Sequence, residues 1–405
     1  MFRKFEVENF MCLKHVTFDL APLTIFIGPN SSGKTAIFQA IKTLCALFGY
    51  PLRRGKFGDF TLEYGIGLDD LVWNRDSSHP IVFKVWFSDN ESADPDYRIE
   101  LRRGYQGWSV VRERLRSEGR TIIDTQERHF SFETSEGPKT YGERPWIAPL
   151  AYLTDRYKAD PLAVSEIKPL QDLRARLGKT RRYRPSAGEI SAFISTTAGT
   201  RRAALYETDD TGKGLALVLR DLVARDRDTF TKIEKELNQF HKHIEGINCK
   251  TDWRGLGFFY KTTRSREDIP ARLESDGVLL TTFLLWRFYS AAAKRENLKV
   301  CLEEPENAIH FSILKQHYGL LKRFTEGNDS NVQILISTHS RDFLNAVGSR
   351  SDVYKMVRVI EYSPANGTVV YNLGHYREID HLMDEFREQV GDLWWSGRAR
   401  RGSEY

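Results

Sequence analysis

The chain has 405 residues, and its 60 Lys and Arg residues against 55 Asp and Glu residues give a formal net charge of +5 at pH 7. Hydrophobic residues make up 40% of the chain and charged residues 28%, a balance that excludes a wholly disordered protein. The length suggests about two or three domain-sized units. The mild positive charge permits a nucleic-acid partner without requiring one.

The N-terminus and the cysteines favour a cytoplasmic protein. Charged side chains interrupt the first ten positions, where a secretory signal needs an apolar stretch. No apolar run approaches the roughly 20 residues of a membrane span, so no membrane partner is expected. The four cysteines form no CxxC pair, which favours reduced thiols; they are Cys12, Cys45, Cys249 and Cys301.

The N-terminal region predicts strands followed by a helix. Alternating apolar side chains predict two short strands within residues 1–20. The continuous apolar run 23–27 predicts a strand buried on both faces. Helical spacing of apolar residues over 35–48 predicts an amphipathic helix directly after a glycine-containing turn.

The rest of the chain divides into three stretches. Residues 60–135 hold short β-type runs separated by Gly, Pro, Asp and Asn, which predict an antiparallel meander. Residues 165–245 have mostly helical spacing. From about 270 helices and strands alternate again, with helices predicted over 277–294 and 310–325 and strands over 299–302 and 332–337.

Residues 28–35 match the pattern GxxxxGK[ST] and predict a phosphate-binding loop. They are Gly28, Pro29, Asn30, Ser31, Ser32, Gly33, Lys34 and Thr35. The glycines let backbone N–H groups converge on an anion, and the following helix adds the positive end of its dipole. Lys34 is expected to reach the β- and γ-phosphates, and Thr35 to offer its hydroxyl to Mg²⁺.

Polar residues follow two later strands at their carboxyl ends, where ligands bind in open α/β sheets. Glu303 and Glu304 follow the strand over 299–302. One acid is expected to hold Mg²⁺ and the next to polarise an attacking water. Alone, such a run would be a solvated acidic turn. His339 follows the strand over 332–337, from which it could hydrogen-bond a γ-phosphate.

These motifs, in this order, resemble the ATP-binding-cassette (ABC) ATPases of the RecF, SMC and OLD (overcoming lysogenisation defect) group. The resemblance covers residues 1–55 and 270–350 and rests on ENF…LTIFIGPNSSGKT, LEEPENAIH and ISTHSRDFL. It implies ATP and Mg²⁺ as cofactors. It places Glu303 at the metal-side acid, where Asp is commoner, Glu304 at the catalytic base and His339 at the switch histidine.

The resemblance implies an α/β fold: an ABC-ATPase head with mixed and parallel sheet, an inserted antiparallel β meander and a helical subdomain. The expected core comprises residues 1–60 and 270–350. Residues 60–135 are expected to form the β insertion within the head, 150–270 a helical lid and 350–405 a C-terminal extension.

In this family a signature loop of one subunit caps the γ-phosphate held by another. The matching residues are Ser275, Asp276 and Gly277, which open the helix before the strand over 299–302. The resemblance therefore implies a homodimer or a higher assembly of dimers. The alternative is an ordinary helix N-cap, since Ser, Asp and Gly are common there.

Three further features of the sequence have candidate roles. Gln126 and Gln171 are the candidates for the family's Q-loop glutamine, and residues 152–156 resemble a degraded YLGPLR-type stretch. A basic run over 174–184 has no acid among its sequence neighbours, so it is a candidate contact for an acidic partner or for nucleic acid. A solvated helix face is the alternative.

Three functions fit these features. The first is the ATPase subunit of an anti-phage defence system similar to PARIS, Septu and retron-associated systems, which would act with a separately encoded nuclease or toxin and respond to DNA or a phage protein. The 66 residues after His339 are too few for the roughly 100-residue Toprim nuclease domain of OLD proteins, so no nuclease activity is expected in the chain. The second is a RecF-like repair ATPase that binds DNA directly, and the third an ATP-gated scaffold with vestigial hydrolysis.

Overall fold

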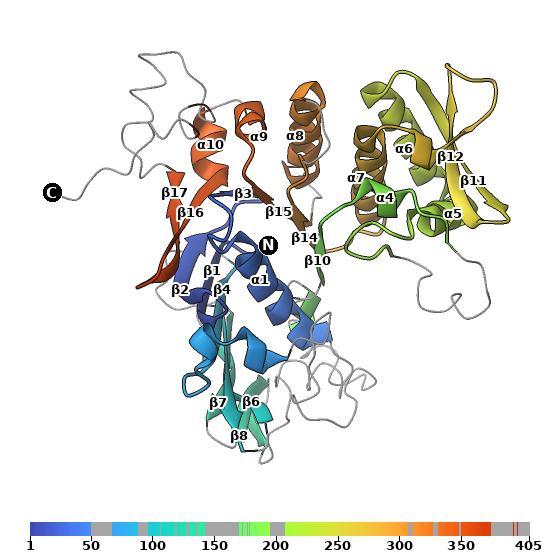
Figure 1. The fold of residues 1–405 in the computed structure, drawn as a ribbon. Coiled ribbons are helices and arrows are strands. Elements are labelled where there is room, and N and C mark those ends of the chain that lie inside the picture. The colour runs from blue at the N-terminus through green and yellow to red at the C-terminus, as the bar shows by residue number, and fades with distance from the viewer. Residues whose placement is uncertain are drawn as a thin grey trace. The chain divides into compact units, whose positions relative to one another are not determined.

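The computed structural model describes the chain except for residues 50–66, 88–95, 106, 118–119, 127–128, 135–136, 142–169, 172, 176, 178, 195–206, 307–310, 327–330, 348–349, 374–391, 393–394 and 396–405. Figure 1 labels the helices and strands along the chain. The chain divides into two compact units. The first comprises Met1–Thr180 with Tyr354–Leu373, and the second Arg181–Val353 with Gly374–Tyr405.

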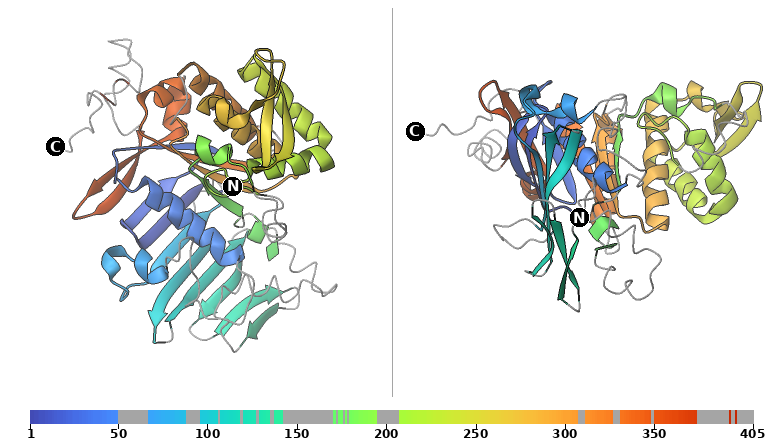
Figure 2. Two further views of the ribbon diagram at one scale, coloured as in Figure 1. Left: turned by 45° about the vertical axis from the view of Figure 1, so that its right-hand side comes forward. Right: turned by 90° about the horizontal axis from the view of Figure 1, so that it is seen from below.

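An eight-stranded antiparallel sheet dominates the first unit (Figure 2). Its order is β2-β1-β4-β5-β6-β7-β8-β9, so the predicted meander continues the N-terminal hairpin. The short helices η3 (Leu68–Leu71) and η4 (Trp73–Arg75) precede β4. The strands are β1 (Lys4–Phe10), β2 (Leu13–Asp19), β4 (Ile81–Trp86), β5 (Tyr97–Gly104), β6 (Gly107–Ser117), β7 (Arg120–Gln126), β8 (His129–Thr134) and β9 (Gly137–Tyr141).

The strand β3 (Leu23–Ile27) is buried at all five residues and leads into the helix α1 (Lys34–Gly49), as predicted. An aromatic chain fixes these elements to the sheet: Phe18 packs edge-on against Phe26 with ring centroids 5.5 Å apart, and Phe26 packs against Phe38 of α1 at 5.8 Å. Such contacts add about 1 kcal/mol each beyond their burial. They hold the loop between β3 and α1 in place.

The expectation of a C-terminal extension over 350–405 is wrong for its central part. The strand β16 (Val357–Ser363) pairs in parallel with β3, and β17 (Gly367–Asn372) pairs antiparallel with β16. The physical reason is that β3 is apolar on both faces and needs strand neighbours. Parallel and antiparallel pairing within one α/β unit confirms the predicted mixed sheet.

In the second unit, parallel strands alternate with helices as predicted. The strand β14 (Leu298–Glu303) pairs in parallel with β15 (Val332–Thr338), with Glu303 opposite Ser337. The strand β10 (Lys179–Tyr183), which begins at the unit boundary, lies on the other side of β14. The helices are α7 (Asp276–Ala293), α8 (Phe311–Glu326) and α9 (Arg341–Ala346), with α10 (Arg350–Met356) at the boundary with the first unit.

The helical lid expected over 150–270 is only partly helical. The helices α4 (Ala187–Ile190), α5 (Leu215–Arg225) and α6 (Arg227–Phe240) are present. They accompany an antiparallel sheet of β11 (Ile244–Asp252), β12 (Gly255–Thr262) and the short β13 (Ile269–Pro270), after which η6 (Ala271–Leu273) leads to α7. β12 is a strand because its aromatic, nearly fully buried run suits a packed sheet. Within the described residues, no helix has the length and apolar character needed to cross a membrane.

A buried histidine pair joins α7 to its neighbours. The hydroxyl of Thr281 donates to the Gly277 carbonyl at 2.7 Å, and it lies 3.0 Å from His241 Nε2 and 2.8 Å from His317 Nε2. Because its single proton is used, both rings must donate their Nε2–H to it. Burial lowers the pKa of His317 to about 3 and that of His241 to about 4.

Acid should therefore destabilise this unit through His317. Because His317 is neutral in the folded chain, it binds a proton more readily in the unfolded chain. Its contribution to the unfolding free energy is therefore complete above pH 6.5. Below that pH it makes the unfolding free energy fall by about 1.4 kcal/mol per pH unit. The variant His317→Gln keeps an N–H donor but does not titrate. Urea unfolding between pH 6.5 and 4 should show a shallower fall for the variant, and equal slopes would contradict a neutral His317.

Candidate active site

The loop over 28–33 is shaped by close packing against β16 and β17. A Cβ added at Gly28 would lie 2.3 Å from the Ile360 carbonyl oxygen, and one at Gly33 would lie 2.2 Å from Thr368 Oγ1. Gly33 has φ +109°, a conformation that L-residues rarely adopt. Thr368 in turn donates to the Ser32 carbonyl at 2.9 Å. The motif's glycines are thus required by backbone shape as well as by contact with an anion.

The polar side chains of the loop divide into buried and exposed ones. Lys34 is buried, and its ammonium donates to the carbonyls of Gly28 and Pro29 at 2.7 Å each. The Ser32 hydroxyl is buried and has no hydrogen-bond partner among the described residues. Asn30, Ser31 and Thr35 are exposed along with Pro29. An unsatisfied hydroxyl, an ammonium and a helix N-terminus together suit a phosphate group.

The acids predicted after β14 lie at its carboxyl end. Glu303 is the last residue of the strand, and its side chain is 6% exposed. Glu304 has φ +46°, a left-handed conformation that is strained for a non-glycine residue. This turn is held by a hydrogen bond from the Glu304 N–H to the Ser337 carbonyl at 2.9 Å. The side chains of Glu303 and Glu304 therefore point in different directions although the two residues are consecutive in the sequence.

His339 meets the second of these acids. Its Nδ1 lies 3.2 Å from Oε1 of Glu304, so the ends of β14 and β15 bring the predicted base and the predicted switch histidine together. Ser340 caps the following helix α9 through a hydrogen bond from the Phe343 N–H. This cap fixes the direction in which the chain leaves β15.

Glu306 is a site residue for which the sequence predicted no role. Its Oε1 accepts a hydrogen bond from the Thr338 hydroxyl at 2.5 Å and from the His339 backbone N–H at 3.4 Å. Burial raises the pKa of Glu306. Its Oε2 has no partner among the described residues. Its place in the acidic run Glu303–Glu306 was the feature by which the sequence could have identified it. The Glu306 carboxylate supports the backbone at His339.

In the basic run over 174–184, the arginines that the structure shows in contact have acidic neighbours, which come from distant parts of the sequence. Arg182 Nε donates to Glu303 Oε1 at 2.6 Å, and an Arg184 nitrogen lies 3.8 Å from Glu304 Oε2. Arg181 forms an ion pair with Glu207 instead. The run ends in the strand β10 rather than on a solvated helix face.

The signature residues occupy the N-terminus of α7. Ser275 is the N-cap position, but its side chain makes no capping hydrogen bond, and both Ser275 and Asp276 are exposed. Gly277 is buried. An ordinary side-chain N-cap therefore does not account for Ser275. Of the Q-loop candidates, Gln126 ends β7 and Gln171 lies half-buried in a helical turn, while residues 152–156 lie outside the described residues.

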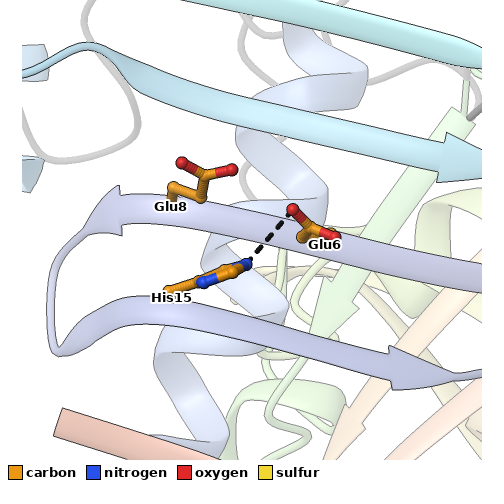
Figure 3. A group of neighbouring side chains, drawn as sticks. All are labelled: Glu6, Glu8 and His15. Carbon is orange, nitrogen blue, oxygen red and sulfur yellow. Dashed lines mark hydrogen bonds and ion pairs between the residues drawn. The ribbon is translucent and has the colours of Figure 1, made fainter. Parts of the chain in front are cut away.

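A second group of potential metal ligands lies on the hairpin β1–β2, where Glu6, Glu8 and His15 point toward one another (Figure 3). The ammonium of Lys84 lies between the acids, 2.5 Å from Glu6 and 2.8 Å from Glu8. Although burial opposes it, the hydrogen bond from Lys84 lowers the pKa of Glu6. The group is accounted for as an ion-pair cluster that joins β1 to β4.

A family profile described as "AAA domain, putative AbiEii toxin, Type IV TA system" matches residues 23–345. An OLD nuclease of Thermus scotoductus (strain ATCC 700910 / SA-01) is 46% identical over 119 residues, which are 28% of this chain and 22% of that protein. The chain thus aligns with less than a quarter of that relative's length.

The solved structures that this chain matches include two SMC heads. One is an SMC head bound to the C-terminal winged-helix domain of ScpA, with a TM-score of 0.47 and 12% identity over 91% of this chain and 96% of that one. The other is the SMC head domain from Thermotoga maritima, with a TM-score of 0.40 and 13% identity over 92% of this chain and 98% of that one.

Gly33→Ala should disrupt the loop because the new Cβ meets Thr368 and the backbone is left-handed. Affinity for a nucleoside triphosphate, measured by calorimetry, should fall at least about tenfold, the equivalent of about 1.4 kcal/mol. Gly319→Ala is the matched control, because nothing lies within 4 Å of its added Cβ in α8. It should raise the melting temperature slightly and leave the affinity unchanged. Unchanged affinity in Gly33→Ala would refute the packing argument.

Proposed function

Since the chain belongs to this AAA domain family, we propose that its ATPase, of the ABC type found in the RecF, SMC and OLD group, controls a separately encoded effector. The effector is a nuclease or a toxin, and the setting is prokaryotic anti-phage defence in the cytoplasm. Two findings support a link to toxin and nuclease systems: the family description names a putative toxin of a toxin–antitoxin system, and the partial relative is an OLD nuclease.

The observation that carries the hydrolytic part of the proposal is the contact between Glu304 and His339. A carboxylate held 3.2 Å from an imidazole, on a strained turn at a strand end, suits a base that accepts a proton from an attacking water. In this role His339 orients the carboxylate. Glu306 holds the His339 backbone in place.

The residues present also fit Mg²⁺ as a cofactor. The exposed Thr35 hydroxyl and the Glu303 carboxylate are hard oxygen donors of the kind this ion prefers. When bound, Mg²⁺ neutralises charge on the β- and γ-phosphates. The chain's own contributions are binding of the phosphates by the loop over 28–35, with Lys34 as its cation, and proton acceptance by Glu304.

Dimerisation follows from the proposed role of Ser275. An exposed hydroxyl at a helix N-terminus that makes no capping hydrogen bond with the described residues suits a contact with an anion. In a dimer, this hydroxyl and the adjacent backbone N–H groups of α7 would meet the γ-phosphate held by the second copy. ATP would then favour the dimer over separate subunits through differential contacts.

The RecF-like alternative is direct DNA binding by the chain. In the basic run over 174–184, a candidate contact for an acidic partner or for nucleic acid, Arg181, Arg182 and Arg184 lie beside acids of the same unit, which favours the first function. The scaffold alternative predicts no turnover, which the next experiment decides.

Glu304→Gln should keep ATP binding and slow hydrolysis by about 10²–10⁴-fold, because the amide keeps the size but cannot accept the proton. With ATP it should also accumulate as a dimer in mass measurements at micromolar concentration. Lys34→Ala is the matched control and should lose ATP binding altogether. If Glu303→Gln spares binding and slows turnover more than Glu304→Gln does, the roles of the two acids are reversed. A strictly monomeric Glu304→Gln with ATP would contradict the dimer.

The effector is tested by co-expression with the neighbouring genes of the native host. A co-purifying complex whose stability changes with ATP, and which Lys34→Ala alters, is expected. The chain alone should hydrolyse ATP and cut no nucleic acid. Nuclease activity of the chain alone that survives Lys34→Ala would overturn control of a separate effector and would leave the ATPase assignment intact.

A further inference from the structure

We infer that Arg182 is a positioning residue of the ATP site, which holds one oxygen of Glu303 and makes metal binding at that acid depend on the nucleotide. The inference rests on the proposed role of Glu303 at the metal. It concerns a residue that lies about 120 positions away in the sequence and belongs to none of the motifs.

The strand β10 aims its arginines by the two-residue period of a strand. Arg182 and Arg184 meet Glu303 and Glu304, while Arg181 pairs with Glu207. Tyr183 is buried and packs edge-on against Phe283 of α7, with ring centroids 5.1 Å apart. The end of the strand is held by a hydrogen bond from the Arg184 N–H to the Asp210 carbonyl at 2.8 Å. The position of Arg182 is therefore set by packing on both sides of it.

The contact between Arg182 and Glu303 is short and shielded from water. Arg182 Nε lies 2.6 Å from Glu303 Oε1, and the two side chains are 22% and 6% exposed. At such burial the field of the guanidinium on the carboxylate is weakly screened by salt. Burial alone would lower the pKa of Arg182, but the bond to Glu303 outweighs it and raises the pKa. The arginine remains a cation at this position.

Two consequences follow for the metal. Arg182 holds Oε1 of Glu303, and the longer reach of Glu compared with Asp suits a carboxylate that serves both an arginine and a metal. In addition, each of the two acids is opposed by an arginine, so the end of β14 is close to neutral instead of doubly negative. A free divalent cation is then repelled by Arg182, and the phosphates of the nucleotide supply the missing negative charge.

Binding of Mn²⁺ to the full-length chain, followed by electron paramagnetic resonance, tests this directly. Without nucleotide, Arg182→Gln should bind Mn²⁺ at least about tenfold more tightly than the unaltered chain, because the competing charge is gone. With a non-hydrolysable ATP analogue the difference should shrink. Arg182→Lys keeps the charge and should stay near the unaltered chain.

Arg181→Gln is the matched control, since this neighbouring arginine pairs with Glu207 and should leave Mn²⁺ binding unchanged. The double variant Arg182→Gln/Glu303→Gln should lose the gain, which assigns it to Glu303. Should Arg182→Gln fail to fold, Arg182→Met is measured in its place, because Met keeps much of the length of the arginine's aliphatic stem. Unchanged or weaker Mn²⁺ binding in a folded variant overturns the inference. ATP binding that persists in that variant, yet is lost in Lys34→Ala, leaves the proposed function standing.

Discussion

The pairing of buried carboxylates at the end of β14 is the constraint on which the second unit depends. An unpaired carboxylate at the burial of Glu303 would cost several kcal/mol, so the strand that ends there must lie beside a cation. Arg182 meets this need from β10. The strand β10 thus contributes more than an additional row of backbone hydrogen bonds, because it brings the charge that allows an acid to end a buried strand.

The same constraint shapes the residues around it. Glu304 adopts a left-handed conformation that takes its carboxylate to His339, and Glu306 turns back to the Thr338 hydroxyl. Three acids in four positions therefore find three different partners. Strain of about 1–3 kcal/mol at one residue is tolerated where the neighbouring contacts over-determine its position, as is common at functional sites.

In the first unit the corresponding constraint is steric. The loop over 28–33 passes so close to Ile360 and Thr368 that a side chain at Gly28 or Gly33 would overlap atoms of β16 or β17. These strands come from the far end of the chain. The shape of the phosphate-binding loop is thus maintained by residues more than 300 positions away, which explains why β16 and β17 belong to this unit.

Local patterns in the sequence determined much of this protein. Periodicity alone predicts β3, α1, β14 and β15, and motif spacing predicts that Lys34, Glu304 and His339 are site residues, because each of these signals lies within one strand, turn or helix. The partners of the basic run, the place of β16 and β17 and the sheet β11–β12 depended on tertiary structure. A guanidinium at position 182 finds Glu303 only when β10 and β14 lie side by side, and a charge pairing across about 120 residues leaves no periodic trace in the sequence.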